Sequence, residues 1–419
     1  MAGSNQIKSR VVVTGIGIVS PVGLDAITTW ENLLAGKSGI GRIASFDAEG
    51  FETTIAAEVK GFEPADYVSR KDARRMDRFV QLAAAATIQA VDNAYLNFNC
   101  LDDERTSVII ASGIGGISTL SKQYGEMSSK GPSRVSPFLI PMMLPDMASG
   151  QVSMLLGAKG PNYAPVSACS SGADALGQAF RLIQHGTADI VFSGGAEAAI
   201  CPIGVAGFNS CKALSTRNDI PEKASRPFDA ERDGFVLGEG AAVLVIESIE
   251  SAVTRGVEPI IEIIGYASTA DAHHITHPTP DGEGGARAMQ LALDDANISP
   301  KEIDYINAHG TSTQINDRCE TMAIKTVFGQ HSYKIPISST KSMTGHLLGA
   351  CGALEAAVSA MSIKNWVAPP TINLEFPDAD CDLDYIPHIP RRGKIKTAMS
   401  NSFGFGGHNA SLIFQAFDE

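Results

Sequence analysis

The chain has 419 residues, 44% of them hydrophobic and 19% charged, so it can bury a large core and is not intrinsically disordered. Lys and Arg number 33 against 46 Asp and Glu, and this net charge of −13 excludes a general attraction to nucleic acid or anionic lipid. No apolar run reaches the roughly 18 residues that a membrane-spanning helix needs. We therefore expect a cytoplasmic protein that binds neither nucleic acid nor membrane.

The first apolar run, Val11–Val19, follows Lys8 and Arg10 as in a signal peptide. No small-residue cleavage site comes after it, so it predicts a buried first strand. Further strand-like runs occupy Ser107–Ala111, Asp189–Phe192, Ala242–Ile246, Ile260–Ile264, Tyr305–Asn307 and Ile335–Ser338. These runs alternate with Ala-rich helical stretches, which is typical of sheets covered on both faces and predicts an α/β architecture.

Two helices are predicted from apolar residues that recur every three or four positions. The first stripe is Leu176, Phe180 and Ile183, and the second is Leu347, Cys351, Leu354, Val358 and Met361. Each helix follows a small-residue turn that carries a reactive side chain, Cys169 or His346. This weak internal repeat predicts two related halves, residues 1–255 and 256–419.

The seven cysteines are scattered, and none forms a Cys-x-x-Cys pair, so zinc-site spacing is absent and a reducing compartment fits. Asp378, Asp380 and Asp382 imitate a calcium loop, but Leu383 and Ile389 stand where that loop has its glycine and its last ligand. We expect no metal site.

Cys169 lies between an apolar segment and a predicted helix, in Val166-Ser-Ala-Cys-Ser-Ser-Gly-Ala173. A thiol at a helix N-terminus faces free backbone N–H groups and the positive end of the helix dipole, which favour the nucleophilic thiolate. A free cysteine is more often a buried structural residue, so this segment by itself leaves both interpretations open.

Two histidines favour catalysis. His309 and His346 each lie in a Gly/Ser/Thr-rich turn beside an apolar element, where we expect side chains to be presented rather than buried. Lys341 precedes His346 by five residues. One such histidine is more often structural, but a cysteine, two histidines and a lysine together form a candidate catalytic set.

The chain resembles the β-ketoacyl-[acyl-carrier-protein] synthases, elongating condensing enzymes of fatty acid synthesis, and among them the type called synthase II. The motifs that carry the resemblance span nearly the whole chain. They are Ala213-Leu-Ser-Thr-Arg-Asn218, Arg226-Pro-Phe-Asp-x-x-Arg-Asp-Gly-Phe235, Asn307-Ala-His-Gly-Thr-Ser-Thr313, Ser339-Thr-Lys-Ser-Met-Thr-Gly-His346 and Asn401-Ser-Phe-Gly-Phe-Gly-Gly407.

This resemblance implies a thiolase-like fold, with two similar α/β halves packed as layered sheets and helices, in a homodimer. It assigns Cys169 as the acyl-carrying nucleophile and His309 and His346 as the pair that acts on malonyl. Lys341 becomes a supporting cation, and Glu355 matches a family acidic residue near it. Chain-starting relatives use Cys-His-Asn, and thiolases have a second Cys in place of one His, so the set found here favours the elongating, decarboxylating branch.

The resemblance also implies the substrate contacts. Phe405 gates the acyl pocket, and its N–H joins that of Cys169 in an oxyanion hole. The other residues matched to substrate-binding positions are Thr311, Thr313, Ile114 and Phe208. Ile114 is expected to limit acyl chain length. Gln314-Ile-Asn316 departs from the small Pro/Ala/Gly-type stretch of the family, so the shape of that loop is not carried over.

The expected chemistry needs no metal and no organic cofactor. Cys169 takes an acyl chain from acyl carrier protein, and malonyl carrier then loses carbon dioxide to give an enolate, which two neutral imidazoles stabilise through N–H hydrogen bonds. To dock an acidic carrier, an acidic enzyme needs a local positive patch. Four residues predict one basic helical face: Lys71, Arg74, Arg75 and Arg78.

Other interpretations remain open. A polyketide-type ketosynthase would share the fold and the catalytic set. A non-catalytic chain-length factor would lack the nucleophile, so Cys169 argues against it, and a redox protein has little support from the cysteine spacing. Ser338-x-x-Lys341 resembles the acylation motif of penicillin-binding enzymes, without its usual partner motifs.

Overall fold

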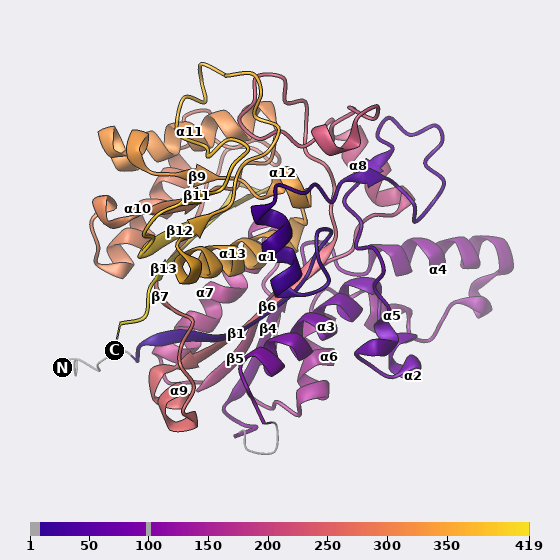
Figure 1. Cartoon of the computed structure of the whole chain (residues 1–419). Coiled ribbons are helices and arrows are strands. Elements are labelled where there is room, and N and C mark those ends of the chain that lie inside the picture. Colours follow the sequence, from indigo (N-terminus) through magenta and orange to yellow (C-terminus); the bar gives the residue numbers. More distant parts are fainter. Residues whose placement is uncertain (1–8, 98–101, 419) are drawn as a thin grey trace.

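A computed structural model describes residues 9–97 and 102–418 (Figure 1). Lys8 of the signal-like start and Cys100 lie outside these residues. Within them, no helix has the length and apolar character needed to cross a membrane. The six cysteines in this part of the chain are free thiols.

The strands form a large mixed sheet. Its nine members among the described residues lie in the order β4 (Thr106–Ala111), β5 (Ile190–Glu197), β6 (Gly240–Ser248), β1 (Val11–Val19), β7 (Ile261–Ala270), β13 (His408–Gln415), β12 (Thr397–Gly404), β8 (Tyr305–Asn307) and β9 (Ile337–Ser338). All seven predicted strands are confirmed. β12 and β13 were not predicted, because Ser and Asn residues interrupt their apolar side chains.

The strand order repeats between the two parts of the chain. β4, β5, β6 and β1 lie side by side, and β8, β12, β13 and β7 lie side by side with the same sequence of one parallel and two antiparallel pairings. β1 pairs with β7, from Val11 opposite Ile263 to Val13 opposite Ile261, and joins the two sets into one sheet. The expected arrangement of two similar α/β halves is confirmed.

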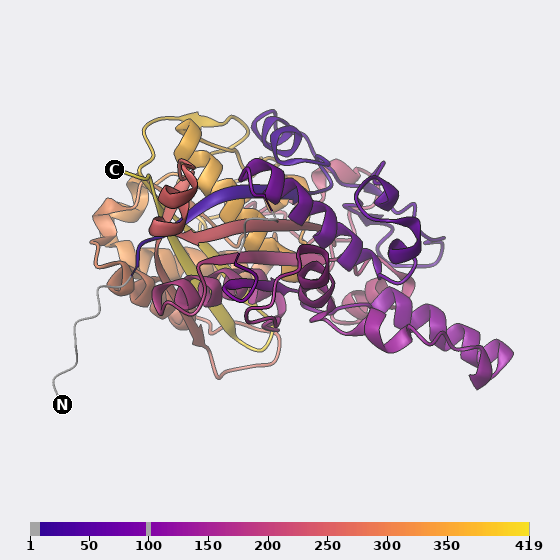
Figure 2. The ribbon, with the colours of Figure 1, turned by 90° about the horizontal axis from the view of Figure 1, so that it is seen from below.

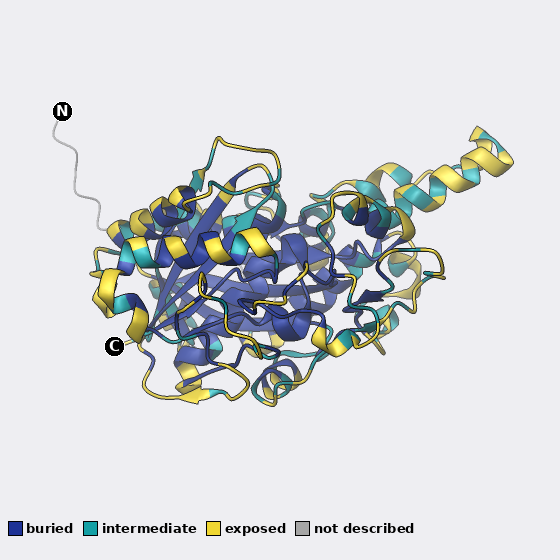
Figure 3. Ribbon diagram, turned by 90° about the horizontal axis from the view of Figure 1, so that it is seen from above, coloured by how far each residue is buried: buried dark blue, intermediate teal, exposed yellow. Residues whose placement is uncertain are grey.

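Helices cover the sheet in layers. α3 (Arg78–Asn93) and α6 (Met147–Leu156) pack on the first half, and α10 (Glu283–Ala296) and α11 (Gln314–Phe328) pack on the second. α7 (Ser171–Gln184) and α13 (Cys351–Asn365) pack on each other and on strands of both halves. Figure 3 shows this interior as the buried centre of the molecule.

Small residues let α7 and α13 approach closely at their first turns. A Cβ on Gly172 would lie 2.8 Å from the Gly349 carbonyl oxygen, so a larger residue would clash. Both predicted helices are confirmed, with one correction. Leu347 lies before α13, because a 3-10 turn, Leu348–Ala350, comes between the His346 turn and the helix. The turns before α7 and α13 therefore meet inside the molecule.

The predicted basic helical face is wrong. α2 (Arg70–Ala73) ends before the two central arginines, and α3 begins only at Arg78, where Asp77 caps it. Arg78 turns toward the protein and pairs with Glu239 at 2.7 Å. Three of the four basic residues stay exposed: Lys71, Arg74 and Arg75.

α4 (Ile117–Lys130) projects from the body, beside α5 (Leu139–Met143), as Figure 2 shows. The other helices are α1 (Ala26–Leu34), α8 (Pro202–Ser210), α9 (Ile249–Arg255) and α12 (Lys341–Thr344). Short strand pairs are β2 (Gly41–Arg42) with β3 (Ile55–Ala56), and β10 (Val367–Ala368) with β11 (Arg391–Arg392).

Candidate active site

One pocket lies where the turns before α7 and α13 meet the ends of β8 and β12. Cys169, His309 and His346 all line it, although they are far apart in the chain. The other matched residues on its wall are Phe208, Thr311, Thr313 and Phe405. Ile114 is not among the lining residues. It packs instead against the hydrophobic cluster that contains Cys169.

Cys169 sits in a tight 3-10 turn, Ala168–Ser170, directly before α7. Ala168 has a φ of 52°, a left-handed conformation that costs an alanine about 1–3 kcal/mol and that the surrounding packing must hold. The Cys169 sulfur lies 3.1 Å from Nε2 of His346, and the Phe405 N–H is near enough to lower the pKa of the thiol. The turn therefore places the Cys169 thiol in the pocket, near the His346 imidazole and the Phe405 N–H.

The expected low pKa of this thiol is wrong. Burial raises the pKa of Cys169 to about 12, while the charge of Lys341 and the Phe405 N–H act in the opposite direction without cancelling it. Only 9% of the residue is exposed, so the loss of hydration outweighs the N-terminal helix position. The thiol is protonated at neutral pH.

Both histidines are buried, each 2% exposed, and so are not presented to solvent as we expected. Their ring centroids lie 5.4 Å apart and their planes are nearly perpendicular, at 82°. Burial, and then the charge of Lys341, holds the pKa of His309 and of His346 well below the usual value. Both imidazoles are neutral at neutral pH.

Lys341 is the cation behind this pair, and it is 1% exposed. Its ammonium donates to the His309 carbonyl oxygen at 2.6 Å and lies 3.3 Å from Nδ1 of His309. It also forms a short ion pair with Glu355, whose pKa burial raises to about 7 against the lowering effect of Lys341. Of the two histidines, Lys341 contacts His309 directly, and its charge lowers the pKa of both imidazoles.

The Gly-Phe-Gly-Gly loop lies between β12 and β13 and touches the turn that carries Cys169. A Cβ on Gly404 would lie 3.0 Å from the Cys169 backbone nitrogen, so glycine is required for this approach. The half-buried Phe405 follows and lines the pocket. The loop therefore brings the backbone N–H of Phe405 beside the turn that carries Cys169.

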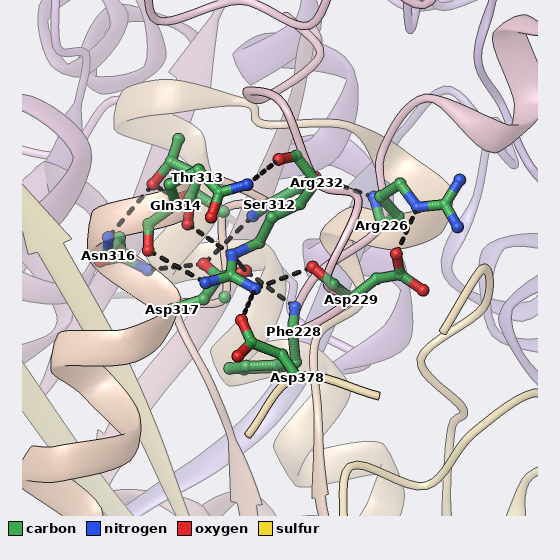
Figure 4. A network of polar contacts seen from close by, with 12 residues as sticks. Arg226, Phe228, Asp229, Arg232, Ser312, Thr313, Gln314, Asn316, Asp317 and Asp378 are labelled. Carbon is green, nitrogen blue, oxygen red and sulfur yellow. Dashed lines mark hydrogen bonds and ion pairs between the residues drawn. The ribbon is translucent and has the colours of Figure 1, made fainter. Parts of the chain in front are cut away.

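A buried polar network fixes the loop after His309 (Figure 4). Arg232 donates to the carbonyl oxygens of Thr313 and Gln314, each at 3.0 Å, and pairs with Asp378 at 2.6 Å. Asp317 accepts from the Ser312 N–H at 3.2 Å. The departure from the family pattern at Gln314 is accommodated here, because residues 314–316 form the first turn of α11 and line the pocket.

Asp378 therefore anchors an arginine rather than a metal ion. Among residues 9–97 and 102–418, no group of three or more His, Cys, Asp or Glu is placed to hold a metal. The serine of the Ser-x-x-Lys motif is also engaged elsewhere, because the hydroxyl of Ser338 lies 2.8 Å from that of Tyr305.

Sequence reasoning missed three buried groups at the site. Glu320 accepts the backbone N–H groups of His309 and Gly310, each at 2.8 Å. Glu197 accepts from the Gly113 and Gly349 N–H groups, and burial raises the pKa of both carboxyls to about 7. A glutamate at the end of an apolar strand was a usable signal for Glu197.

The third missed group is Cys351. Its thiol lies 3.0 Å from Nδ1 of His346. The sequence placed it in an apolar helical stripe, so it was predicted as core.

Repeated α/β halves that meet at a thiol and two imidazoles define a thiolase-like ketosynthase. The family models for the N-terminal and C-terminal domains of beta-ketoacyl synthase match residues 8–252 and 260–375. The chain belongs to the β-ketoacyl synthase family, whose members are acyl-transferring condensing enzymes.

Relatives resemble the chain over nearly its full length. The 3-oxoacyl-[acyl-carrier-protein] synthase 2 of Staphylococcus aureus strain N315 is 53% identical over 411 residues, 98% of this chain and 99% of the relative. The protein of the same name from Synechocystis is 51% identical over 414 residues, 99% of this chain and 100% of the relative. The resemblance to elongating condensing enzymes is confirmed.

Solved structures agree. A beta-ketoacyl synthase from Burkholderia phymatum STM815 has a TM-score of 0.91 at 39% identity, covering 98% of this chain and 100% of that one. A ketosynthase in complex with its type II polyketide acyl-carrier protein has a TM-score of 0.92 at 36% identity, with the same coverage.

Proposed function

We propose that this chain is an acyltransferase that condenses an acyl group held on Cys169 with malonyl-[acyl-carrier-protein]. The product is a 3-oxoacyl-[acyl-carrier-protein] two carbons longer, in fatty acid elongation. The observation that carries the proposal is the meeting of one thiol and two neutral imidazoles in one pocket. The names of the relatives that share about half of the sequence support it.

In the first half-reaction, the Cys169 sulfur attacks the acyl thioester and forms a new thioester, and the proton of the thiol passes to the departing carrier sulfur. The N–H groups of Cys169 and Phe405 receive the negative oxygen of the tetrahedral intermediate. The Phe405 N–H contact with the sulfur supports this role. These donors stabilise the negative charge that develops during the attack. The stabilisation is needed because burial opposes ionisation of the Cys169 thiol.

In the second half-reaction, His309 and His346 donate N–H hydrogen bonds to the thioester oxygen of malonyl. The C–C bond to the carboxylate breaks, carbon dioxide leaves, and the electron pair forms the enolate. The enolate carbon attacks the acyl carbonyl and releases the Cys169 sulfur as a thiolate, which takes one proton from water to restore the thiol. Each oxyanion donor typically supplies about 10²–10³ in rate. Lys341, held by Glu355, keeps His309 in place and keeps both rings neutral.

The remaining site roles are proposals of the same kind. Phe405 gates the acyl pocket, and Thr311 and Thr313 contact the substrate. Their hydroxyls lie 3.0 Å apart on the pocket wall. Phe208 lines the acyl pocket and Ile114 limits the length of the acyl chain, supported by their packing in the cluster around Cys169.

We propose that the domain boundary lies between residues 255 and 256, supported by the two family models and by the repeated strand order. The enzyme works in the cytoplasm with acyl- and malonyl-loaded carrier protein, and the solved ketosynthase–carrier complex supports that partner. Exposed apolar side chains on α4, α5 and α6 support a homodimer: Leu120, Tyr124, Met127, Ile140, Met154 and Leu155.

Two substitutions of the nucleophile test the proposal. Cys169→Ala should abolish acyl transfer and condensation. Cys169→Gln should lose acyl transfer but keep malonyl decarboxylation, because the amide carbonyl occupies the place of the acyl thioester. Both half-reactions are measured with carrier thioesters, and the buried-thiol variant Cys319→Ala serves as the control. Covalent acylation of Cys169→Ala would contradict the proposal, and a preference for polyketide extender chains would favour the alternative.

A further inference from the structure

The imidazole of His346 lies between two thiols. Its Nε2 atom is 3.1 Å from the sulfur of Cys169, in the pocket. Its Nδ1 atom is 3.0 Å from the sulfur of Cys351, the first residue of α13. The proposed function uses the Nε2 side of the ring, which faces the pocket, and leaves the contact with Cys351 without a role.

The other hydrogen bond of the Cys351 sulfur shows which group donates in its contact with His346. The backbone N–H of Leu347 donates to the Cys351 sulfur at 3.0 Å, so the sulfur already acts as an acceptor. A thiol carries one proton that it can donate. Burial raises the pKa of Cys351 well above the usual value. The charge of Glu355 acts in the same direction, while Lys341 and the Leu347 N–H oppose it, so the thiol keeps its proton. The Nδ1 atom of His346 is the acceptor within reach.

We propose that Cys351 is a positioning residue of the condensing reaction. Its S–H donates to Nδ1 of His346 and keeps the proton of the neutral ring on Nε2, which faces Cys169. This inference rests on the role proposed for His346, because a neutral imidazole has a single N–H. If that proton moved to Nδ1, Nε2 could no longer donate to the enolate oxygen.

The imidazole of His309 also has a donor beside its Nδ1 atom. The Lys341 ammonium can only donate, and it lies 3.3 Å from Nδ1 of His309, so the proton of that ring is also directed to Nε2. The first residue of α13 and the first residue of α12 thus each place a donor behind an imidazole. A packing role for Cys351 alone, as a member of the central hydrophobic cluster, would make no demand on its S–H.

The test compares Cys351→Ala, which removes the donor, with Cys351→Ser, which keeps a hydroxyl donor in nearly the same volume. In the full-length enzyme with ¹⁵N-labelled histidine, the His346 signals are assigned by their loss in His346→Asn. We expect the Nε2–H tautomer in the wild-type and Ser variants and a mixture of tautomers in the Ala variant. The kcat of malonyl decarboxylation should fall about tenfold in Cys351→Ala at unchanged KM, the effect of one hydrogen bond.

Cys381→Ala is the matched control, since it removes another buried thiol that lies in a different hydrophobic cluster. It should change neither the His346 tautomer nor kcat. The proposal is overturned if Cys351→Ala retains the Nε2–H tautomer, or if Cys351→Ser loses as much activity as Cys351→Ala. Full activity in His346→Asn would instead refute the proposed function, and the tautomer measurement on Cys351→Ala would still stand.

Discussion

At the level of single residues, the charge of Lys341 links the acidic residue behind it to the two imidazoles in front. The ammonium touches Glu355 on one side and His309 on the other. Burial is the larger cause of the low pKa of both histidines, and the lysine charge is the next. The site therefore combines a desolvated environment with one fixed positive charge to keep the rings neutral.

Replacing Lys341 by methionine should raise the pKa of both His309 and His346. Removing a nearby cation makes protonation of a base easier, so both rings should become charged at a higher pH than in the wild type. NMR titration of ¹⁵N-labelled histidine measures the change directly. The double variant Lys341→Met/Glu355→Gln removes the unpaired carboxyl, and exposed Lys364→Met is the control. Unchanged titration in the double variant would contradict this account.

At the level of elements, the loop between β8 and α11 owes its shape to Arg232 rather than to its own residues. The Arg232 side chain is 2% exposed, and it joins the loop carbonyls to Asp317 and Asp378. This explains why the motif from Arg226 to Phe235 lies beside a histidine turn that is some 70 residues further along the chain.

Arg232→Met should destabilise the fold by about 3–5 kcal/mol, because it leaves the buried Asp317 and the half-buried Asp378 carboxylates without their partner. Chemical denaturation measures the free energy of unfolding. The exposed pair between Arg217 and Glu231 offers the control, since Arg217→Met should cost less than about 1 kcal/mol. Equal losses in the two variants would show that the network does not hold the loop.

At the level of the whole molecule, α4 and its neighbours expose apolar side chains that a second copy would cover. Tyr124→Asp combined with Ile140→Asp places two charges on this surface and should convert the proposed dimer to a monomer, as read by light scattering after gel filtration. Ile389→Asp, at an exposed apolar position outside α4–α6, should leave the mass unchanged. A dimer that survives the double substitution would place the interface elsewhere.

Because the chain has a net charge of −13, an acidic carrier protein needs a local group of cations to bind to. We propose that the exposed Lys71, Arg74 and Arg75 near α2 form this docking site. Lys71→Glu combined with Arg74→Glu should raise KM for carrier-bound substrate about tenfold while leaving KM for a small thioester unchanged. Arg75 is left intact because its guanidinium lies over the Phe138 ring. Exposed Lys364→Glu controls for the change in net charge, and equal effects on both substrates would argue against docking here.

Much of the fold could be predicted from sequence because its signals are local. Buried strands such as Val11–Val19 show as apolar runs, and α7 shows as a stripe of period three to four. The turns that carry Cys169, His309 and His346 were visible as Gly/Ser/Thr-rich segments. β12 escaped prediction because its burial comes from neighbours in space, and its own residues include Ser and Asn.

The sequence by itself determined the family and the set of Cys169, His309, His346 and Lys341, because short motifs carry them. Only the tertiary structure placed the two thiol partners of His346, since Cys169 lies 177 positions away from it. Burial also decided the electrostatics: it raised the pKa of Cys169, where the position at the start of a helix predicted a low one. Desolvation depends on every neighbour in space, and for that reason no local pattern in the chain could reveal it.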